Sequence, residues 1–450
     1  MEIWRCFKEN DVKGLPKIVH LVDVYEACQL GKQHQIPFPF QSSWKAKRTI
    51  IAYSLISLWS NDSFISGRQK VDTFIGLKIN TLRTVSGGEY LSNEFDKYCR
   101  HNGSLISFSN SQKSKLACNF PAIFNFGDSN SDTGGLFAAF GPLPSPYGQT
   151  FFHHPSGRYS DGRLMIDFMA ESLGLPYLSA YLDSVGSNFS HGTNFATAGS
   201  TIRPTTNNYP SSKYGFSPFS LNVQLIEYSY FKNRTEKYIT QGGEFAALPK
   251  ADYFLKGLYT FDIGQNDMTE GYFSILTNDK KTNDQIKATV PDMISQFSNV
   301  IKGVYALGGR SFWIHNTGPL GCYPFVLKNL PIKPEQLDKY GCGIPYNDVP
   351  QYFNQLLKEA VIQLRKDLPL AALTYVDIYS LKYTLITQAT KLGFETFLPY
   401  RPNGGEFDTD PKAIMWDGTH FTEMANKWLF QQFVNGSFSD PPTPLNLACP

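Results

Sequence analysis

The sequence predicts an α/β fold of three layers, in which a central parallel sheet lies between helices. From Ala122 onward, apolar runs of strand length alternate with segments whose apolar residues recur at helical spacing. Such alternation is typical of crossover helices that cover both faces of a parallel sheet. The clearest helix covers about residues 287–307, where an apolar stripe runs along one face: Val290, Met293, Ile294, Phe297, Ile301 and Val304.

The remaining elements are expected in a regular order. The first strand covers residues 122–126, and a helix with one apolar face follows over residues 163–173. Further strands are predicted over residues 255–261, 311–315 and 373–378, and further helices over residues 349–364 and from Thr422 onward. In sheets of this kind, ligands bind at the carboxyl ends of the strands, so the residues that follow each strand are the candidates for chemistry.

Charge divides the chain into two dissimilar parts. Overall, 41 basic and 39 acidic residues nearly balance, which argues against a chain built around a polyanion. Up to residue 117, however, there are 16 basic and 10 acidic residues, against 25 and 29 beyond it. We therefore expect a basic leader over residues 1–117 and a separate domain over residues 118–450.

The cysteines and the apolar segments limit which classes of protein the chain can belong to. The seven cysteines (Cys6, Cys28, Cys99, Cys118, Cys322, Cys342 and Cys449) show no metal-ligand spacing. The apolar stretch from Ile50 to Trp59 is too short and too interrupted to span a bilayer. Glycosylation sequons begin at Asn188, Asn233 and Asn435, and they matter only if the chain is exported.

Ser129 is the candidate nucleophile, because it lies in a turn of small and polar residues directly after the first strand. A serine in such a turn is more often a capping or turn residue. Near the other end, Asp417 and His420 stand three residues apart on one short loop. A serine hydroxyl needs a base to accept its proton, and the base needs a carboxylate to fix its tautomer. His315 is the main rival base, but no carboxylate lies close to it in sequence.

Two further segments could stabilise an oxyanion. They contain Gly199, with its backbone N–H, and Asn266, with its side-chain amide, alongside the N–H of Ser129. The alternative roles are a turn for Gly199 and a helix cap for Asn266. No GxSxG elbow surrounds any serine, which disfavours the common α/β-hydrolase arrangement.

Residues 118–450 resemble plant GDSL esterases/lipases of the SGNH hydrolase superfamily. The resemblance rests on residues 120–135 (FPAIFNFGDSNSDTGG), on the segments around Gly199 and Asn266, and on the last segment through Asp417 and His420. It implies a flavodoxin-like α/β/α sandwich and hydrolysis of carboxylic esters through an acyl-serine. It implies no metal or organic cofactor, a small-molecule or polymer ester as substrate, a disulfide between Cys322 and Cys342, and a secreted protein.

The segment before Asp417 departs from the family pattern. Family members carry a longer, cysteine- and glycine-rich stretch here, whereas residues 394–414 contain no cysteine. This shortening supports an alternative hypothesis, a catalytically weak storage or defence-type protein with the same fold. A glycosidase would need two carboxylates across a sugar site, and the serine triad fits the residues better.

The leader resembles fragments of a copia-type retrotransposon polyprotein around its integrase. Tyr25 replaces the first cysteine of a zinc pair, and Val85 occupies the position of a metal-binding Asp. Because zinc and two-metal sites each require several ligands, we expect no metal chemistry here. We expect no nucleic-acid binding either, because the basic and aromatic residues of the leader show no organised face. The leader is interpreted as degenerate, and it stands where a secretion signal is expected.

Overall fold

The computed structural model describes two units separately. They are Met1–Lys115 and Leu116–Pro450. In the first, only β1 (Thr81–Thr84) and β2 (Leu105–Phe108) are described, and they pair in parallel. In the second, the structure describes residues 117–141, 145, 147–204, 217–243, 245–273, 281–395 and 412–450. The residues that support the interpretation of the leader therefore lie almost wholly outside the described part.

The second unit is built on a sheet of six strands in the order β4-β3-β5-β6-β7-β8. The strands are β3 (Ile123–Gly127), β4 (Gly192–Asn194), β5 (Leu258–Asp262), β6 (Ser311–His315), β7 (Ala372–Val376) and β8 (Ser439–Asp440). Neighbours pair in parallel, except that β8 runs antiparallel to β7 at the edge. The predicted parallel sheet is thus confirmed. Its antiparallel edge strand β8 was not predicted, because two residues are too few to show a strand pattern.

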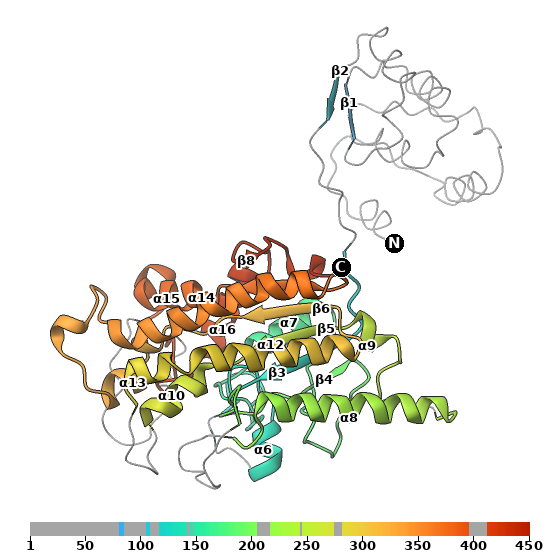
Figure 1. Ribbon diagram of the computed structural model, residues 1–450, viewed down its shortest axis with the longest axis horizontal. Coiled ribbons are helices and arrows are strands. Elements are labelled where there is room, and N and C mark those ends of the chain that lie inside the picture. Colours follow the sequence, from blue (N-terminus) through green and yellow to red (C-terminus); the bar gives the residue numbers. More distant parts are fainter. Residues whose placement is uncertain are drawn as a thin grey trace. The chain divides into compact units, whose positions relative to one another are not determined.

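Helices cover both faces of this sheet, as Figure 1 shows. The helices are α6 (Gly135–Phe140), α7 (Met165–Ser172), α8 (Leu221–Thr240), α9 (Tyr253–Lys256), α10 (Gln265–Phe273), α11 (Asn283–Lys287), α12 (Val290–Ala306), α13 (Pro324–Asn329), α14 (Ile344–Asp367), α15 (Ile378–Thr387) and α16 (Glu423–Phe433). On one face, α12 packs between α8 and α14, and on the other, α16 packs against α7 and α15. This confirms the predicted three-layer architecture.

The core explains why the first strand is so well fixed. Alternate residues of a strand point to opposite faces, and Phe124 and Phe126 both meet Tyr228 of α8, with ring centroids 5.7 Å apart in each pair. Phe126 also stacks on Phe261 of β5 at 4.8 Å. Asn125 lies between these two phenylalanines in sequence, and its amide belongs to a polar network at the site described below. All six residues of the predicted stripe on α12 are buried.

Some predicted elements differ from the observed ones. The strand predicted from residue 255 begins at Leu258, because the three residues before Gly257 belong to α9. The strand predicted to residue 378 ends at Val376, and Ile378 begins α15. The longest missed element is α8, whose buried face includes the polar residues Gln224 and Thr235 and therefore shows no clear apolar stripe.

Two disulfides close loops of very different size. Cys322 is joined to Cys342, the pair that the family resemblance implied. Cys118 is joined to Cys449, a link that sequence reasoning missed, across a separation of 331 residues. The Cys118 N–H also donates to the Asn446 carbonyl at 2.7 Å. The bond therefore ties the start of the second unit to its end.

Removing the Cys118–Cys449 disulfide is expected to destabilise the protein strongly. The Cys118→Ser/Cys449→Ser variant should lose roughly 2–5 kcal/mol of unfolding free energy, because the crosslink restricts a very long loop in the unfolded chain. Urea denaturation of the oxidised proteins measures this. The Cys322→Ser/Cys342→Ser variant is the matched control, and its separation of 20 residues predicts a smaller loss. Equal midpoints for wild type and the first variant would contradict the expectation.

Candidate active site

Ser129 lies in the first turn after β3, which pairs with β4 on one side and β5 on the other. The turn is closed by backbone bonds from the Ser131 and Asp132 N–H groups to the Asp128 carbonyl, at 3.1 and 2.9 Å. Ser129 itself is 5% exposed. The end of β3 thus presents one serine hydroxyl at the carboxyl edge of the sheet, where the fold class expects ligand chemistry.

His420 approaches this hydroxyl from the other end of the chain. Its Nε2 lies 2.8 Å from Ser129 Oγ, and its Nδ1 lies 2.5 Å from Asp417 Oδ2. The side chains of His420 and Asp417 remain 14% and 15% exposed, so solvent reaches this group of residues. The geometry brings together all three residues predicted to act as nucleophile, base and orienting carboxylate.

Hydrogen bonding explains the ionisation of Asp417. Its Oδ1 accepts the backbone N–H groups of Thr419 and His420, at 2.9 and 2.7 Å. Burial alone would raise the pKa of this carboxyl, but attraction to the His420 imidazole and these hydrogen bonds hold it below the ordinary value of 3.8. An ionised Asp417 accepts from Nδ1–H of His420. Nε2 is then the nitrogen that carries a lone pair toward Ser129.

The loop that carries Asp417 and His420 is closed on itself. The Trp416 N–H donates to the His420 carbonyl at 3.1 Å, and the Thr422 N–H donates to the Ile414 carbonyl at 3.0 Å. The Thr422 hydroxyl then caps α16 by accepting from the Ala425 N–H. Most of the segment whose shortening was noted, residues 396–411, lies outside the described residues. Within residues 412–422, these backbone bonds join the two sides of the loop.

Contacts with residues 159–163 hold the start of α16 in place. Arg163 pairs with Glu423 at 2.7 Å, and the Glu423 N–H donates to Asp161 Oδ1 at 2.6 Å. The Tyr159 ring lies against the His420 imidazole, with centroids 5.2 Å apart. Residues 159–163 therefore support the His420 loop from outside its own segment.

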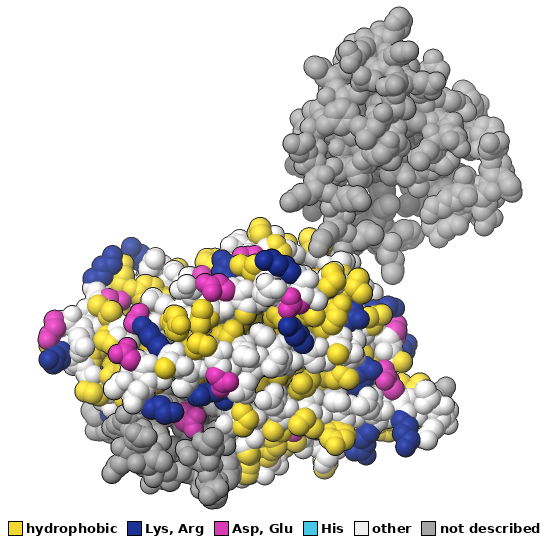
Figure 2. Space-filling model, viewed as in Figure 1, with side chains coloured by type: hydrophobic (Ala, Val, Ile, Leu, Met, Phe, Trp, Pro, Cys, Tyr) yellow, Lys and Arg dark blue, Asp and Glu magenta, His cyan; other side chains and the backbone are white. Residues whose placement is uncertain are grey.

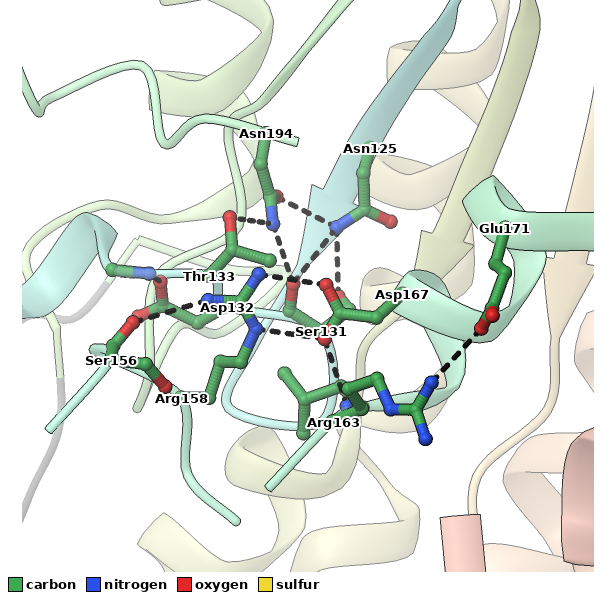
Figure 3. A network of polar contacts seen from close by, with 12 residues as sticks. Asn125, Ser131, Asp132, Thr133, Ser156, Arg158, Arg163, Asp167, Glu171 and Asn194 are labelled. Carbon is green, nitrogen blue, oxygen red and sulfur yellow. Dashed lines mark hydrogen bonds and ion pairs between the residues drawn. The ribbon is translucent and has the colours of Figure 1, made fainter. Parts of the chain in front are cut away.

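Ser131 and Thr133, in the turn that contains Ser129, belong to a buried polar network that fixes the turn (Figure 3). Asn125 Nδ2 donates to Ser131 Oγ at 3.0 Å and to Asn194 Oδ1 at 2.7 Å. Asn194 Nδ2 donates in turn to the Ser131 carbonyl at 2.6 Å and to Thr133 Oγ1 at 2.9 Å. Because these groups are buried, each lost partner would leave an unsatisfied polar atom, which costs free energy. The network therefore favours one conformation of the turn.

Two further residues that sequence reasoning missed anchor this turn. Asp132 accepts backbone N–H groups from Gly134, Gly135, Leu136 and Ala198, and so joins the turn to the segment that leads to Gly199. Gln224 of α8 bonds both backbone groups of Gly127, accepting its N–H at 2.9 Å and donating to its carbonyl at 2.8 Å. Asp132 and Ala198 are 66 residues apart, and Gln224 and Gly127 are 97 apart, so spacing gave no signal for these two contacts.

The predicted oxyanion donors lie on segments that meet the same turn. Asn266, near the start of α10, donates to the Ser200 carbonyl at 2.9 Å and to Asp128 Oδ2 at 3.3 Å. Gly199 adopts a φ of +78°, a conformation that favours glycine. Asn266 is thus bonded both to the residue before Ser129 and to the residue after Gly199.

His315, the rival base, lies in a different environment. It is buried at the end of β6, where its Nδ1 lies 3.0 Å from Asp262 Oδ2 and its Nε2 accepts from Trp313 Nε1 at 3.1 Å. Its carboxylate partner lies 53 residues away in sequence, which is why spacing did not show it. With both ring nitrogens engaged, His315 has no free lone pair for a substrate proton.

Within the described ranges, no three His, Cys, Asp or Glu side chains gather in a way that could hold an ion.

Comparison with known proteins identifies the family of the chain. The model of the GDSL-like lipase/acylhydrolase family matches residues 123–433. A GDSL esterase/lipase of Arabidopsis thaliana is 54% identical over 360 residues, covering 74% of this chain and 93% of the relative. An esterase of Hevea brasiliensis is 51% identical over 359 residues (74% and 90%). A protein named alpha-L-fucosidase 3 of Arabidopsis thaliana is 50% identical over 360 residues (74% and 95%). The chain belongs to the GDSL-like lipase/acylhydrolase family.

Proposed function

We propose that this protein, a carboxylic ester hydrolase by family, works through an acyl-serine intermediate formed on Ser129. His420 acts as general base and acid, and Asp417 orients it. One observation carries the proposal: an unbroken line of hydrogen bonds runs from Asp417 through His420 to Ser129. This is the arrangement that turns a weak serine hydroxyl into a nucleophile.

The reaction then has two balanced halves. Ser129 Oγ bonds to the ester carbonyl carbon while its proton passes to His420 Nε2. The carbon–oxygen bond to the alcohol breaks, and the imidazolium returns that proton to the leaving alkoxide. A water molecule repeats the sequence on the acyl-serine, with His420 again as base, and releases the acid. Asp417 stays ionised throughout and stabilises the imidazolium.

Asn266 is assigned to the oxyanion hole together with the backbone N–H groups of Ser129 and Gly199. Asn266→Ala is expected to lower kcat by roughly 10²–10³ with little change in KM, because a donor to the transition-state oxyanion contributes little to substrate binding. Steady-state hydrolysis of p-nitrophenyl acetate measures this. The matched control is Thr269→Ala on the same helix, whose hydroxyl bonds only backbone carbonyls of α10. Equal kcat for wild type and Asn266→Ala would contradict the role.

The substrate is proposed to be a small-molecule or polymer ester, such as a lipid, an acylated plant metabolite or an acetylated polysaccharide. Aromatic side chains adjoin the His420 loop: Tyr159 lies against His420, and Tyr147 contacts both Tyr159 and Trp416. On the face drawn in Figure 2, basic and acidic side chains of the described residues are interspersed, which gives no support for a polyanionic partner.

A glycosidase activity, suggested by the name of one relative, is less well supported. It would need two carboxyl groups free to act across a sugar. Asp417 is engaged by His420, and Asp132 accepts four backbone N–H groups. Neither is free for such a role.

We also propose that residues 118–450 carry the activity alone and mature in an oxidising compartment. The two disulfides favour such a compartment. The sequon asparagines Asn188, Asn233 and Asn435 are all exposed, as glycosylation requires. No described helix is long and apolar enough to cross a membrane. The leader is assigned no role.

The direct test of activity is pre-steady-state hydrolysis of p-nitrophenyl acetate by the full chain. An acyl-serine mechanism predicts a burst of p-nitrophenol whose size approaches one equivalent of enzyme if deacylation is the slower half. No hydrolysis above the rate in buffer, in protein that is folded by circular dichroism, would favour the storage or defence-type alternative.

A further inference from the structure

A buried lysine, Lys382 of α15, lies close to the candidate active site and is 1% exposed. Its Nζ donates to Asn130 Oδ1 at 3.5 Å, and it lies 4.9 Å from the centre of the Phe421 ring. Asn130 follows Ser129 in the chain, and Phe421 follows His420. One ammonium group thus contacts the neighbour of the proposed nucleophile and the neighbour of the proposed base.

We propose that Lys382 is a positioning residue, whose buried charge bonds Asn130 and stabilises the neighbouring Asp128 carboxylate, so that Asn130 and Asn266 stay bonded to it beside Ser129. The proposal rests on the function proposed above. Lys382 is assigned no part in the chemical steps, and it acts through these neighbours.

The charges around Lys382 explain why a lysine is needed there. Two buried carboxylates, Asp128 and Asp262, attract its charge, and burial together with the same two carboxylates raises the pKa of Tyr323. Burial lowers the pKa of Lys382, and the two carboxylates oppose that effect. Despite burial, the pKa of Asp262 lies below its ordinary value because His315 and Lys382 stabilise the carboxylate. Lys382 is therefore the cation that both acids share.

Asp128 is the more sensitive of the two acids. Burial and repulsion from Asp262 raise its pKa to about 7, while hydrogen bonds from Asn130 and the charge of Lys382 oppose the rise. As a carboxylate, Asp128 accepts from the Asn130 N–H at 3.0 Å, from Asn130 Nδ2 at 2.9 Å and from Asn266 Nδ2 at 3.3 Å. Its ionised form therefore orients both the residue after Ser129 and the proposed oxyanion donor.

The sign of the pH effect follows. Removing a positive charge near a carboxyl group raises its pKa. Without Lys382, Asp128 would stay protonated to a higher pH and would hold Asn130 and Asn266 less firmly. The acid limb of the kcat–pH profile should therefore move to higher pH. A purely structural role would lower stability without moving that limb.

The test compares Lys382→Met, Asp128→Asn and the double variant in the full chain, with p-nitrophenyl acetate as substrate. For Lys382→Met at pH 7 we expect kcat to fall by about tenfold, with KM changed by less than about twofold. The acid limb should shift by about one pH unit or more toward higher pH. Lys302→Met is the matched control, because it removes a half-exposed lysine that pairs with Asp367.

The double variant tests the coupling. If Lys382 acts through the charge of Asp128, adding Lys382→Met to Asp128→Asn should change kcat by less than about twofold, because the two effects are not additive. This comparison also applies if Lys382→Met alone does not fold, since the double variant has lost one charge of each sign. A tenfold loss in the double variant relative to Asp128→Asn would overturn the proposal. So would a folded Lys382→Met protein with an unmoved acid limb.

Failure of this inference is distinguishable from failure of the proposed function. If wild-type Ser129 reacts with a fluorophosphonate but Lys382→Met behaves as wild type, only the role of Lys382 is wrong. If wild-type Ser129 does not react, the proposed mechanism is wrong as well.

Discussion

Ser129→Ala is expected to abolish ester hydrolysis, with a loss in kcat of about 10⁶. Without the hydroxyl, no acyl-enzyme can form, and His420 Nε2 loses the partner that it faces at 2.8 Å. The oxyanion donors and the substrate site stay in place, so a residual rate above that in buffer should remain, with KM little changed. Initial rates on p-nitrophenyl acetate over a range of enzyme concentrations measure this loss.

The control for Ser129→Ala is Ser298→Ala on α12, whose hydroxyl bonds the Ile294 carbonyl within the helix. It should keep wild-type activity. If Ser129→Ala, folded and monodisperse, kept more than about a tenth of the wild-type kcat, Ser129 would not be the nucleophile and the mechanism would have to be abandoned.

Asp417→Asn is expected to lower kcat by about 10⁴ at neutral pH while the fold is retained. The asparagine amide accepts the N–H groups of Thr419 and His420 through its oxygen and presents an NH₂ group to His420 Nδ1. That donor selects the tautomer with its proton on Nε2, which cannot accept from Ser129. Steady-state kinetics at pH 7 measures the loss, and Asp252→Asn, on an exposed carboxylate paired with Lys256, is the control.

Acid titration gives a second signature of Asp417. Its pKa is depressed in the folded protein, so its carboxylate adds stability above the ordinary pKa of 3.8, and that contribution is lost as pH falls through the lower folded value. Asp417→Asn should therefore lose less stability than wild type between pH 4 and pH 2.

An unchanged kcat in Asp417→Asn would show that His420 does not need this partner.

The sequence predicted those parts of the fold whose residues carry a local pattern. The stripe on α12 recurs at helical spacing, and β6 has an apolar centre of Phe312, Trp313 and Ile314, so period and length sufficed. In α8, Gln224 faces the interior to bond Gly127, and this buried polar residue interrupts the stripe that would have marked the helix. The strand β4 is three residues long and contains glycine, so its pairing with β3 depends on tertiary contacts.

The candidate site likewise divides into residues that a local pattern reveals and contacts that only the folded chain brings about. Ser129, Gly199, Asn266 and the Asp417–His420 pair could be predicted, because each lies in a short segment of recognisable residues. Their supports were not found, because each depends on a contact between segments far apart in the chain. Lys382 and Asn130 are separated by 252 residues, and Gln224 and Gly127 by 97. The Cys118–Cys449 link was missed for the same reason.

The most direct test of the central claim is labelling of the full chain with a fluorophosphonate, followed by mass-spectrometric mapping of the modified residue. The account predicts one modified serine, Ser129, and loss of labelling in His420→Ala, because the hydroxyl then has no proton acceptor. Labelling of a different serine, or no labelling of folded wild-type protein, would contradict it.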